Sequence, residues 1–169
     1  MGFPSKLKDL NYFSDGFSFR GVVGEVTVPK LTMKLEDWRG GGMIGAAPWS
    51  QGIDKLELEF KVGGLLREAF RHFGGTIGEA PVDRFVGAYQ DDDSGAVQAL
   101  EIVTRGVTSE IDMGGAKVGD DTEHAFKRTC TYYKLIVDGE VWIEIDIIAG
   151  IFIVFGVDRY AEIRAAIGG

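Results

Sequence analysis

The segment from Leu56 to Val62 alternates strictly between apolar and charged residues, and this pattern constrains the fold more than any other feature of the chain. Successive side chains of a β-strand point to opposite faces, so a period of two predicts a strand with one buried side. The segment from Val26 to Trp38 also alternates, and we expect the two strands to pair. The side chains predicted to face the core are Leu31, Met33, Leu35, Leu56, Leu58, Phe60 and Val62.

Two Asp-Gly pairs predict tight hairpin turns. Asp15-Gly16 lies between aromatic-rich runs, and Asp138-Gly139 separates two further apolar runs. Asp-Gly is typical of the two-residue type I′ turn that joins antiparallel strands. Residues 90–95 form a third, longer turn that contains three consecutive aspartates and ends in glycine. The strands predicted around these turns are Phe85–Tyr89, Val97–Val107, His124–Val137 and Glu140–Ile148.

Helical spacing is confined to two segments. Gly64–Gly74 places Leu66, Ala69, Phe70 and Phe73 on one face, and Gly74 is a suitable residue to end the helix. Val157–Ile167 has the spacing of a second, shorter helix at the C-terminus. The 169 residues suit a single domain, 1–169. We therefore predict a mainly β fold with one central α-helix and a short C-terminal helix.

A glycine-rich segment, Arg39–Asp54, is predicted to be a long loop. Loops longer than about 12–15 residues are uncommon inside compact domains and are usually functional. Within it, Gly40–Gly45 has the glycine spacing of a dinucleotide-binding loop. Such a loop must open a helix whose N-terminus holds the pyrophosphate, whereas Pro48, Trp49 and Gly52 follow here. A nucleotide site is therefore not favoured.

Charge and composition argue against several classes of protein. A protein with a net charge of −8 is unsuited to binding nucleic acid through its phosphates. The uninterrupted apolar run, Ile147–Val157, is too short to span a bilayer, and no secretion signal is recognisable near the N-terminus. We expect a cytosolic, soluble protein without a membrane anchor.

No catalytic, cofactor-binding or metal-binding residue is predicted. The aspartates of 91–93 resemble the start of a calcium loop, but Ile102 occupies the position where that loop needs glutamate. His72 is expected near the C-terminal end of the predicted helix, where its positively charged form would interact favourably with the helix dipole. Cys130 is expected to act as a small buried apolar residue. His72 and His124 are far apart in sequence, and no serine or metal motif accompanies them.

An ordered set of motifs along nearly the whole chain resembles the major tail tube proteins of contractile-tailed phages and the tube proteins of R-type tailocins, which are tails without heads. No single motif is decisive; the order of the whole set carries the resemblance. The segments are Phe3–Leu7, Asn11–Gly16, Val26–Glu36, Arg39–Met43, Gly87–Tyr89, Arg105-Gly106, Glu110–Gly114, Gly119–Glu123, Tyr132–Leu135, Asp138-Gly139, Glu144–Asp146, Gly156–Arg159 and Ile167-Gly168.

The resemblance implies a compact β-sandwich or barrel with one flanking α-helix, a structural function and no cofactor. Six subunits would form a ring, with four strands of each lining one inner β-barrel, and the rings would stack into a hollow tube. The expected partners are further copies, a sheath protein, a tape-measure protein, and baseplate and tail-terminator proteins, with DNA only as a transient passenger. The expected location is a virion tail or tailocin particle, and the bacterial host cytoplasm during assembly.

Two sets of residues are assigned roles within this interpretation. The long loop would carry ring-to-ring contacts through Arg39, Gly42, Met43, Ile44 and Trp49, since aromatic residues and methionine are enriched at protein interfaces. Trp49 could instead fold back onto the core. The polar sides of the first two strands would line the channel through Lys30, Thr32, Lys34, Glu36, Glu57, Glu59 and Lys61. An ordinary solvated outer face is the alternative for this second set.

One segment departs from the family. Ile151–Phe155 is more apolar than the corresponding stretch of these proteins, and it is either a buried strand or an apolar interface. Two other classes of protein stay open. One is a secreted ring protein of the type VI system, which shares the architecture, and the other is a small-molecule-binding β-barrel or an unrecognised enzyme.

Overall fold

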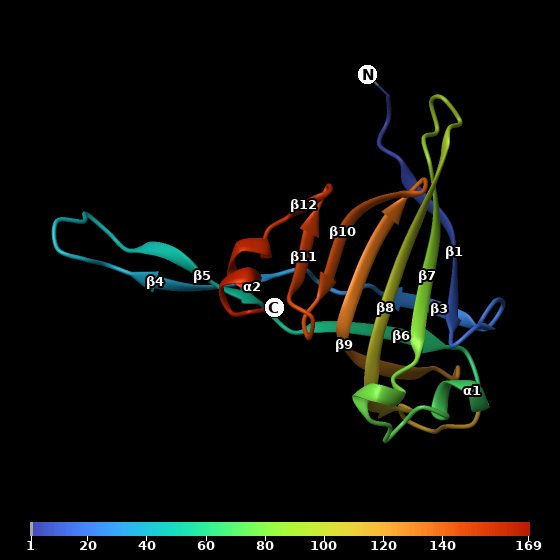
Figure 1. Ribbon diagram of the computed structural model, residues 1–169. Helices are drawn as coiled ribbons and strands as arrows, with labels where there is room; N and C mark the ends of the chain where they lie inside the picture. Colours follow the sequence, from blue (N-terminus) through green and yellow to red (C-terminus); the bar gives the residue numbers. More distant parts are fainter. Residues whose placement is uncertain (1) are drawn as a thin grey trace.

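The computed structural model describes residues 2–169, which form a large antiparallel β-sheet, a projecting two-stranded arm and two short α-helices (Figure 1). The large sheet runs in the order β12-β11-β10-β9-β8-β7-β1-β2, and β6 joins it through β9 and carries β3. The strands are β1 Lys6–Ser14, β2 Phe17–Ser18, β3 Val23–Thr27, β4 Met33–Trp38, β5 Ala47–Ile53, β6 Leu56–Val62, β7 Val82–Gln90, β8 Val97–Asp112, β9 His124–Val137, β10 Glu140–Asp146, β11 Ile151–Val154 and β12 Val157–Asp158.

The two longest strands, β8 and β9, run through both halves of the sheet. The first half of β9 pairs with β6, and its second half pairs with β10. Where the halves meet, the register of β8 against β9 shifts between Arg105 and Gly106. Such a bulge bends and twists a strand. The sheet therefore bends at this point, and the half with β3 and β6 packs against the half that contains β1.

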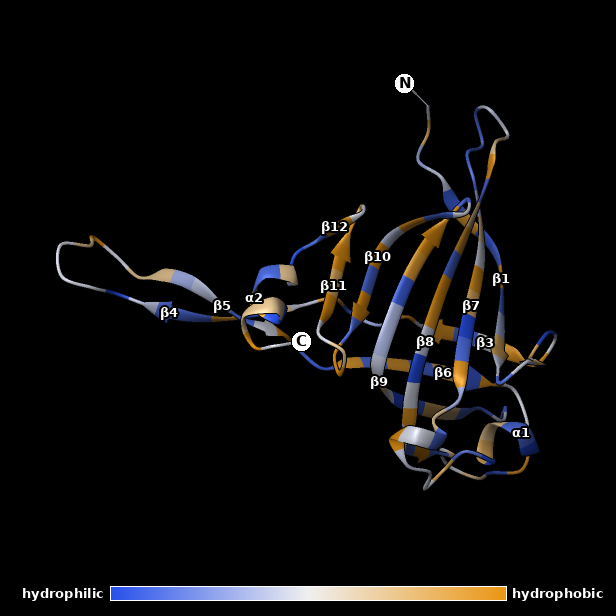
Figure 2. Cartoon of the chain, viewed as in Figure 1, coloured by the Kyte–Doolittle hydropathy of each residue, from blue (hydrophilic) through white to orange (hydrophobic). Residues whose placement is uncertain are grey.

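The core lies between these two halves and is rich in aromatic rings. Leu56, Leu58, Phe60 and Val62 are all buried, which confirms the inward face predicted for β6. The ring of Phe60 stacks on Tyr12 of β1 at 4.6 Å and on Phe126 of β9 at 5.1 Å, measured between ring centroids. The hydropathy colouring shows the same alternation along the strands (Figure 2).

The predicted Asp-Gly turns are confirmed. Asp15-Gly16 and Asp138-Gly139 have φ angles of 50° and 82°, and of 49° and 81°. Positive φ at both central residues defines the type I′ turn. A third turn of this kind, Phe155-Gly156, has φ angles of 48° and 81° and joins β11 to β12. Sequence reasoning missed this turn because a phenylalanine rarely takes such a conformation.

Both helices are shorter than predicted. The segment Gly64–Gly74 contains only α1, Arg67–Phe70, in which Ala69 is buried while Phe73 beyond its end is exposed. Pairs of glycines flank this segment, and Leu66 provides no side-chain cap, so little holds a longer helix. The second helix, α2, covers Ala161–Ala166, because Val157-Asp158 pairs with β11 instead. A 3₁₀ turn covers Ile77–Glu79.

The predictions for Val26–Trp38 and for Arg39–Asp54 were wrong. Val26–Trp38 is not one strand: β3 ends at Thr27 and pairs with β6, whereas β4 leaves the body of the protein and pairs with β5. Arg39–Asp54 is not one loop, because Ala47–Ile53 is strand β5. Leu31, Met33 and Leu35 are exposed rather than buried. A free two-stranded ribbon tolerates Pro48 and Gly52, which had suggested a loop, since its outer edges need no ladder partners.

Candidate assembly interface

The arm formed by β4 and β5 is the most unusual feature of the surface. Asp54 donates its backbone N–H to the carbonyl of Thr32 at 2.9 Å, which closes the arm at its base. Beyond that point the strands pair only with each other, from Met33 opposite Ile53 to Trp38 opposite Ala47. Figure 1 shows the arm extending away from the body of the protein. The arm thus presents both of its faces to the surroundings.

The loop at the arm tip, residues 39–46, turns one apolar side chain inward and another outward. The backbone N–H of Gly40 donates to the sulfur of Met43 at 3.0 Å, and the N–H of Met43 donates to the carbonyl of Gly40 at 3.3 Å. Gly42 has a φ of 83°, which a glycine adopts without steric cost. These contacts hold Met43 against the loop and leave Ile44 fully exposed.

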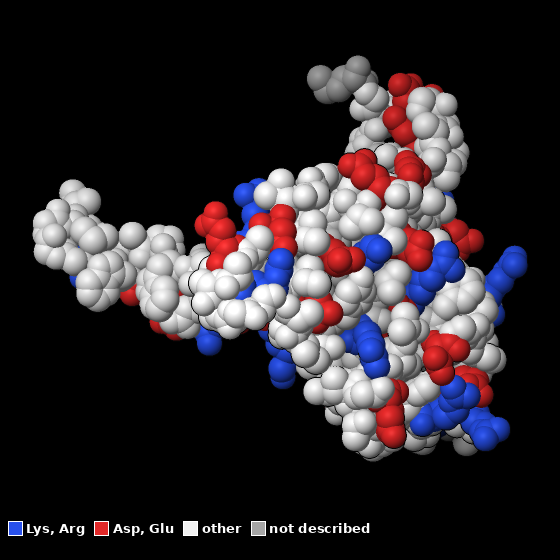
Figure 3. Space-filling model, in the orientation of Figure 1, with Lys and Arg blue, Asp and Glu red and all other residues white. Residues whose placement is uncertain are grey.

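Residues 40–53 include no charged side chain, and the outer part of the arm is accordingly white in Figure 3. Trp38 and Trp49 are nonetheless 65% and 51% exposed. Trp49 lies on β5 and does not fold back onto the core, so that alternative is wrong. Large exposed apolar side chains rimmed by polar residues mark an interaction site. Four of the five residues predicted for stacking, Arg39, Gly42, Met43 and Ile44, lie in the tip loop, and the fifth is Trp49.

The residues predicted to line a channel fall into two groups. Lys30, Thr32, Glu57 and Glu59 line one groove together with Lys127 of β9, and Lys61 follows on the same face of β6. Lys34 and Glu36 lie apart from them, exposed on β4 of the arm. The separation arises because β4 pairs with β5 rather than with β6.

The outer face of β6 carries charges of both signs. The ammonium of Lys61 lies 3.6 Å from the carboxylates of both Glu25 and Glu123, and these two acidic groups raise its pKa. Lys127 lies 3.6 Å from Glu110 in the same way. Paired charges of opposite sign leave a surface with little net attraction for a polyanion.

Several sheet edges are left without a partner in residues 2–169. Strand β1 pairs with β7 along its length, but β2 covers its other side only at Phe13 and Ser14. At the opposite end of the sheet, β12 pairs with β11 through only two residues and has no further neighbour. Unpaired edges favour the addition of a strand from another chain. Sequence reasoning did not identify these edges, because alternation does not reveal a strand's neighbours.

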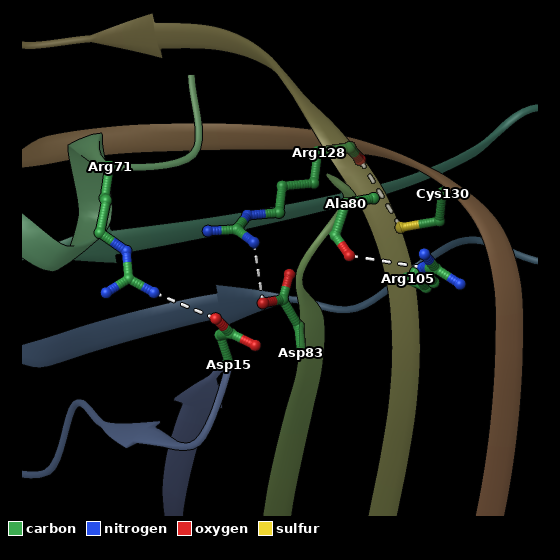
Figure 4. Close-up of polar contacts among 7 residues, drawn as sticks. All are labelled: Asp15, Arg71, Ala80, Asp83, Arg105, Arg128 and Cys130. Carbon is green, nitrogen blue, oxygen red and sulfur yellow. Dashed lines mark hydrogen bonds and ion pairs between the residues drawn. The ribbon is translucent and has the colours of Figure 1, made fainter. Parts of the chain in front are cut away.

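A buried ion pair between Asp83 and Arg128 is the other feature that sequence reasoning missed (Figure 4). An Nη1 nitrogen of Arg128 lies 2.9 Å from a carboxylate oxygen of Asp83, and neither side chain is more than 1% exposed. Burial raises the pKa of Asp83 to about 6, although the arginine opposes this shift. The pair joins β7 to β9 inside the core and has no access to solvent. Its place in the core makes it a structural element rather than a reaction site.

The remaining reactive groups are also unsuited to catalysis. Cys130 is buried as predicted, and burial raises the pKa of its thiol to about 11. Figure 4 shows that other arginines make structural contacts: Arg105 donates to the carbonyl of Ala80, and Arg71 pairs with Asp15. Arg105 also donates to the carbonyl of Gly78. The described part of the chain contains no cluster of side chains that could hold a metal ion. None of the helices in residues 2–169 has the length and apolar character needed to cross a membrane.

Comparison with known proteins establishes the family. The sequence model of the family described as phage tail tube protein FII matches residues 4–168. The chain is 44% identical over 171 residues to the tail tube protein of Escherichia phage P2, and the match covers 99% of each chain. It is 39% identical over 171 residues to the major tail tube protein of Serratia phage KSP20, covering 99% of this chain and 98% of the relative.

The fold also resembles that of solved structures. It matches a chain of the PVC sheath-tube complex, an extracellular contractile injection system in its extended state, with a TM-score of 0.59. That match covers 80% of this chain and 92% of the other at 8% identity, so the likeness concerns the fold alone.

A mainly β protein with free sheet edges and a projecting arm that exposes apolar side chains belongs to the class of structural subunits that build larger assemblies. The chain is a member of the phage tail tube protein FII family, in agreement with its motifs. It is therefore a tail component of a phage particle and not an enzyme.

Proposed function

We propose that this protein builds the inner tube of a contractile phage tail or tailocin, with six copies in each ring and the rings stacked into a hollow tube. The observation that carries this proposal is the pair of unpaired edges at β1 and β12, at opposite ends of one sheet. Strand addition from copy to copy would join the sheets into a closed barrel, which removes the exposed edges. The chain would act as a single tail-tube domain, 1–169.

The arm would then join neighbouring rings. Its exposed apolar side chains support this role, because an apolar contact between rings would bury Trp38, Ile44 and Trp49. The partners of the tube would be a sheath protein around it, a tape-measure protein inside it, and baseplate and tail-terminator proteins at its ends. The location would be the tail of the particle, after assembly in the host cytoplasm.

Removal of the arm tests this assignment. Met33 lies opposite Ile53, so residues 34–52 can be replaced by the dipeptide Asn-Gly, which closes a hairpin at that point. The shortened subunit should fold and melt like the complete chain, because the arm contributes little to the core. It should form no long tubes when examined by sizing chromatography and negative-stain electron microscopy across a concentration series.

Two results would count against the proposal. A complete chain that stays monomeric at every concentration, with no rings on grids, would refute assembly into a tube. Normal long tubes from the shortened subunit would leave the tube intact but would remove the arm from the ring-to-ring contact.

The channel wall would be the outer face of β6, with Glu57, Glu59 and Lys61, together with Lys30 and Thr32 in the adjoining groove. The paired charges of this face support the assignment, because DNA should pass it without adhering. The acidic balance of the chain agrees, since six copies at −8 give 6 × −8 = −48 per ring. Lys34 and Glu36 would belong to the arm and not to this wall.

Cysteine labelling tests the position of this wall. Cysteines at Glu57→Cys and Glu59→Cys, each in a Cys130→Ser background, are treated with a maleimide too bulky to enter the channel. Both should react much more slowly in assembled tubes than in dispersed subunits of the same variant. Equal rates in the two states would place this face on the outside of the tube.

A further inference from the structure

A small apolar pocket lies at the base of the arm. Its volume is about 160 Å³. The pocket lies where β10 turns into β11, beside the last residues of β5 and the residue before α2. An apolar cavity of about 150 Å³ accepts a group the size of benzene. This pocket can therefore hold one branched aliphatic side chain. The residues that line it are Gly52, Ile53, Ile145, Asp146, Ile147, Gly150, Ile151, Phe152 and Tyr160.

The rim of the pocket is held in place by polar contacts behind it. A carboxylate oxygen of Asp146 accepts the backbone N–H groups of Ile148 at 3.1 Å and Ala149 at 3.0 Å. The guanidinium of Arg164 donates to the carbonyl of Gly150 at 2.9 Å and to the carboxylate of Asp158 at 2.6 Å. These contacts fix the β10–β11 turn against α2. A group that enters the pocket therefore does not have to order its walls.

The chain itself carries a side chain suited to this pocket. Ile44 is fully exposed at the arm tip, within a stretch that has no charge. The two arm residues at the pocket, Gly52 and Ile53, lie at the opposite end of β5. A strand of seven residues spans roughly 23 Å. Ile44 therefore cannot reach the pocket of its own chain.

We propose that the pocket at the base of the arm receives Ile44 from a second copy of this chain, a contact that rests on the proposed role of the arm in assembly. Each copy then offers a protruding side chain at one end of the arm and a receiving pocket at the other. Such a head-to-tail contact repeats from copy to copy and closes only when the rotation between copies allows it. The arm length therefore sets the spacing between joined copies, roughly 25–30 Å.

Disulfide trapping tests the contact. One subunit carries Ile44→Cys and another carries Ile147→Cys, both in a Cys130→Ser background, and the two are mixed in equal amounts under assembly conditions. Ile147 lines the pocket and is 47% exposed, so its cysteine can be reached. The control partner is Phe155→Cys, which is 58% exposed and does not line the pocket. Assembled tubes should form the 44–147 disulfide at least about tenfold more than the 44–155 disulfide, because a disulfide requires Cα atoms about 4.4–6.8 Å apart.

A charge substitution gives a second measurement without cysteines. Ile44→Asp should raise the protein concentration required for tube formation by at least about tenfold, whereas Ile44→Leu should leave it within about twofold. If tubes form and the 44–147 and 44–155 disulfides appear equally, the pocket assignment is overturned while the tube proposal stands. The same conclusion follows if 44–44 disulfides dominate or if Ile44→Asp assembles normally. Absence of tubes from the unmodified chain would overturn both proposals.

Discussion

Replacing Gly106 by alanine tests the argument that β8 must approach β9 very closely where the sheet turns over. A Cβ atom at this position would lie 2.8 Å from the Cα of Cys130 and closer still to the carbonyl oxygen of Thr129. Both are backbone atoms of the paired strand and cannot rotate away, so β8 and β9 would have to separate. Overpacking of a well-packed site costs about 1–3 kcal/mol. For a chain of this size, each kcal/mol lowers the melting temperature by roughly 2–4 °C.

The measurement is a thermal melt of the dispersed subunit, in which Gly106→Ala should lower the melting temperature by roughly 2–12 °C. Gly24→Ala is the matched control, because Gly24 lies in β3 with no atom within 4 Å of the added methyl group. The control should melt close to the unmodified chain. If Gly106→Ala melts like Gly24→Ala, the close approach of the two strands does not constrain this position.

Three further predictions concern groups inside the body of the protein and at its edge. Because burial raises the pKa of Asp83 to about 6, this carboxyl stabilises the folded state most at low pH and less as pH rises through that value. The free energy of unfolding of the native subunit should therefore fall more between pH 4 and 7 than that of Asp83→Asn, and parallel profiles would contradict this. The Cys130 thiol should react with a maleimide at pH 7.5 at least about 100-fold more slowly in the folded subunit than in denaturant. The reason is that this thiol is buried and has a pKa of about 11. Rapid labelling of the native subunit would contradict this prediction. Phe155→Asn should raise the melting temperature of the dispersed subunit by roughly 2–4 °C, because asparagine tolerates the positive φ of 48° better than phenylalanine does. A lower melting temperature would show that the contact of Phe155 with Trp142 stabilises the subunit more than the strain destabilises it.

The parts of the fold that were predicted correctly depend on local patterns. The alternation of Leu56–Val62 gave the correct inward face, because β6 has the core on one side only. The turns at Asp15-Gly16 and Asp138-Gly139 were identified because few residue pairs tolerate positive φ at both positions. In each case the residues themselves carry the physical cause of the structure.

The parts that were missed depend on distant neighbours. Val26–Trp38 was interpreted as one strand, but its two ends belong to different sheets. The apolar positions change from even to odd numbers between Val28 and Leu31, and this change marks the division that was overlooked. For the same reason Met33 and Leu35 were assigned to the core, although the arm has no core to bury them. The ion pair of Asp83 and Arg128 joins residues 45 positions apart in the chain, and no local sequence motif around either residue indicates that they pair.

The position of the candidate interface on the arm agrees in part with the residues named from the sequence. The segment with Met43 and Ile44 was predicted to be functional from its length and glycine content, and this stays a prediction; the structure places both residues in the tip loop, although the strands beside it were not predicted. The pocket at the base of the arm could not be predicted, since β5, β10, β11 and the residue before α2 meet there only in the folded chain. Ile151–Phe155 proves to contain strand β11, which is partly buried and joins the sheet near that pocket.

The pairing of β6 with β9 has a consequence for how the protein is made. Strand β6 ends at residue 62, and its partner in β9 begins at residue 124. A ribosome adding about 5–20 residues each second needs several seconds to produce the intervening chain. During that interval the edge of β6 that pairs with β9 has no partner, and neighbouring ribosomes on the same message carry the same unpaired edge. Synthesis of many tail subunits at once therefore favours strand exchange between nascent chains, and the rate of translation should limit the yield of soluble subunit.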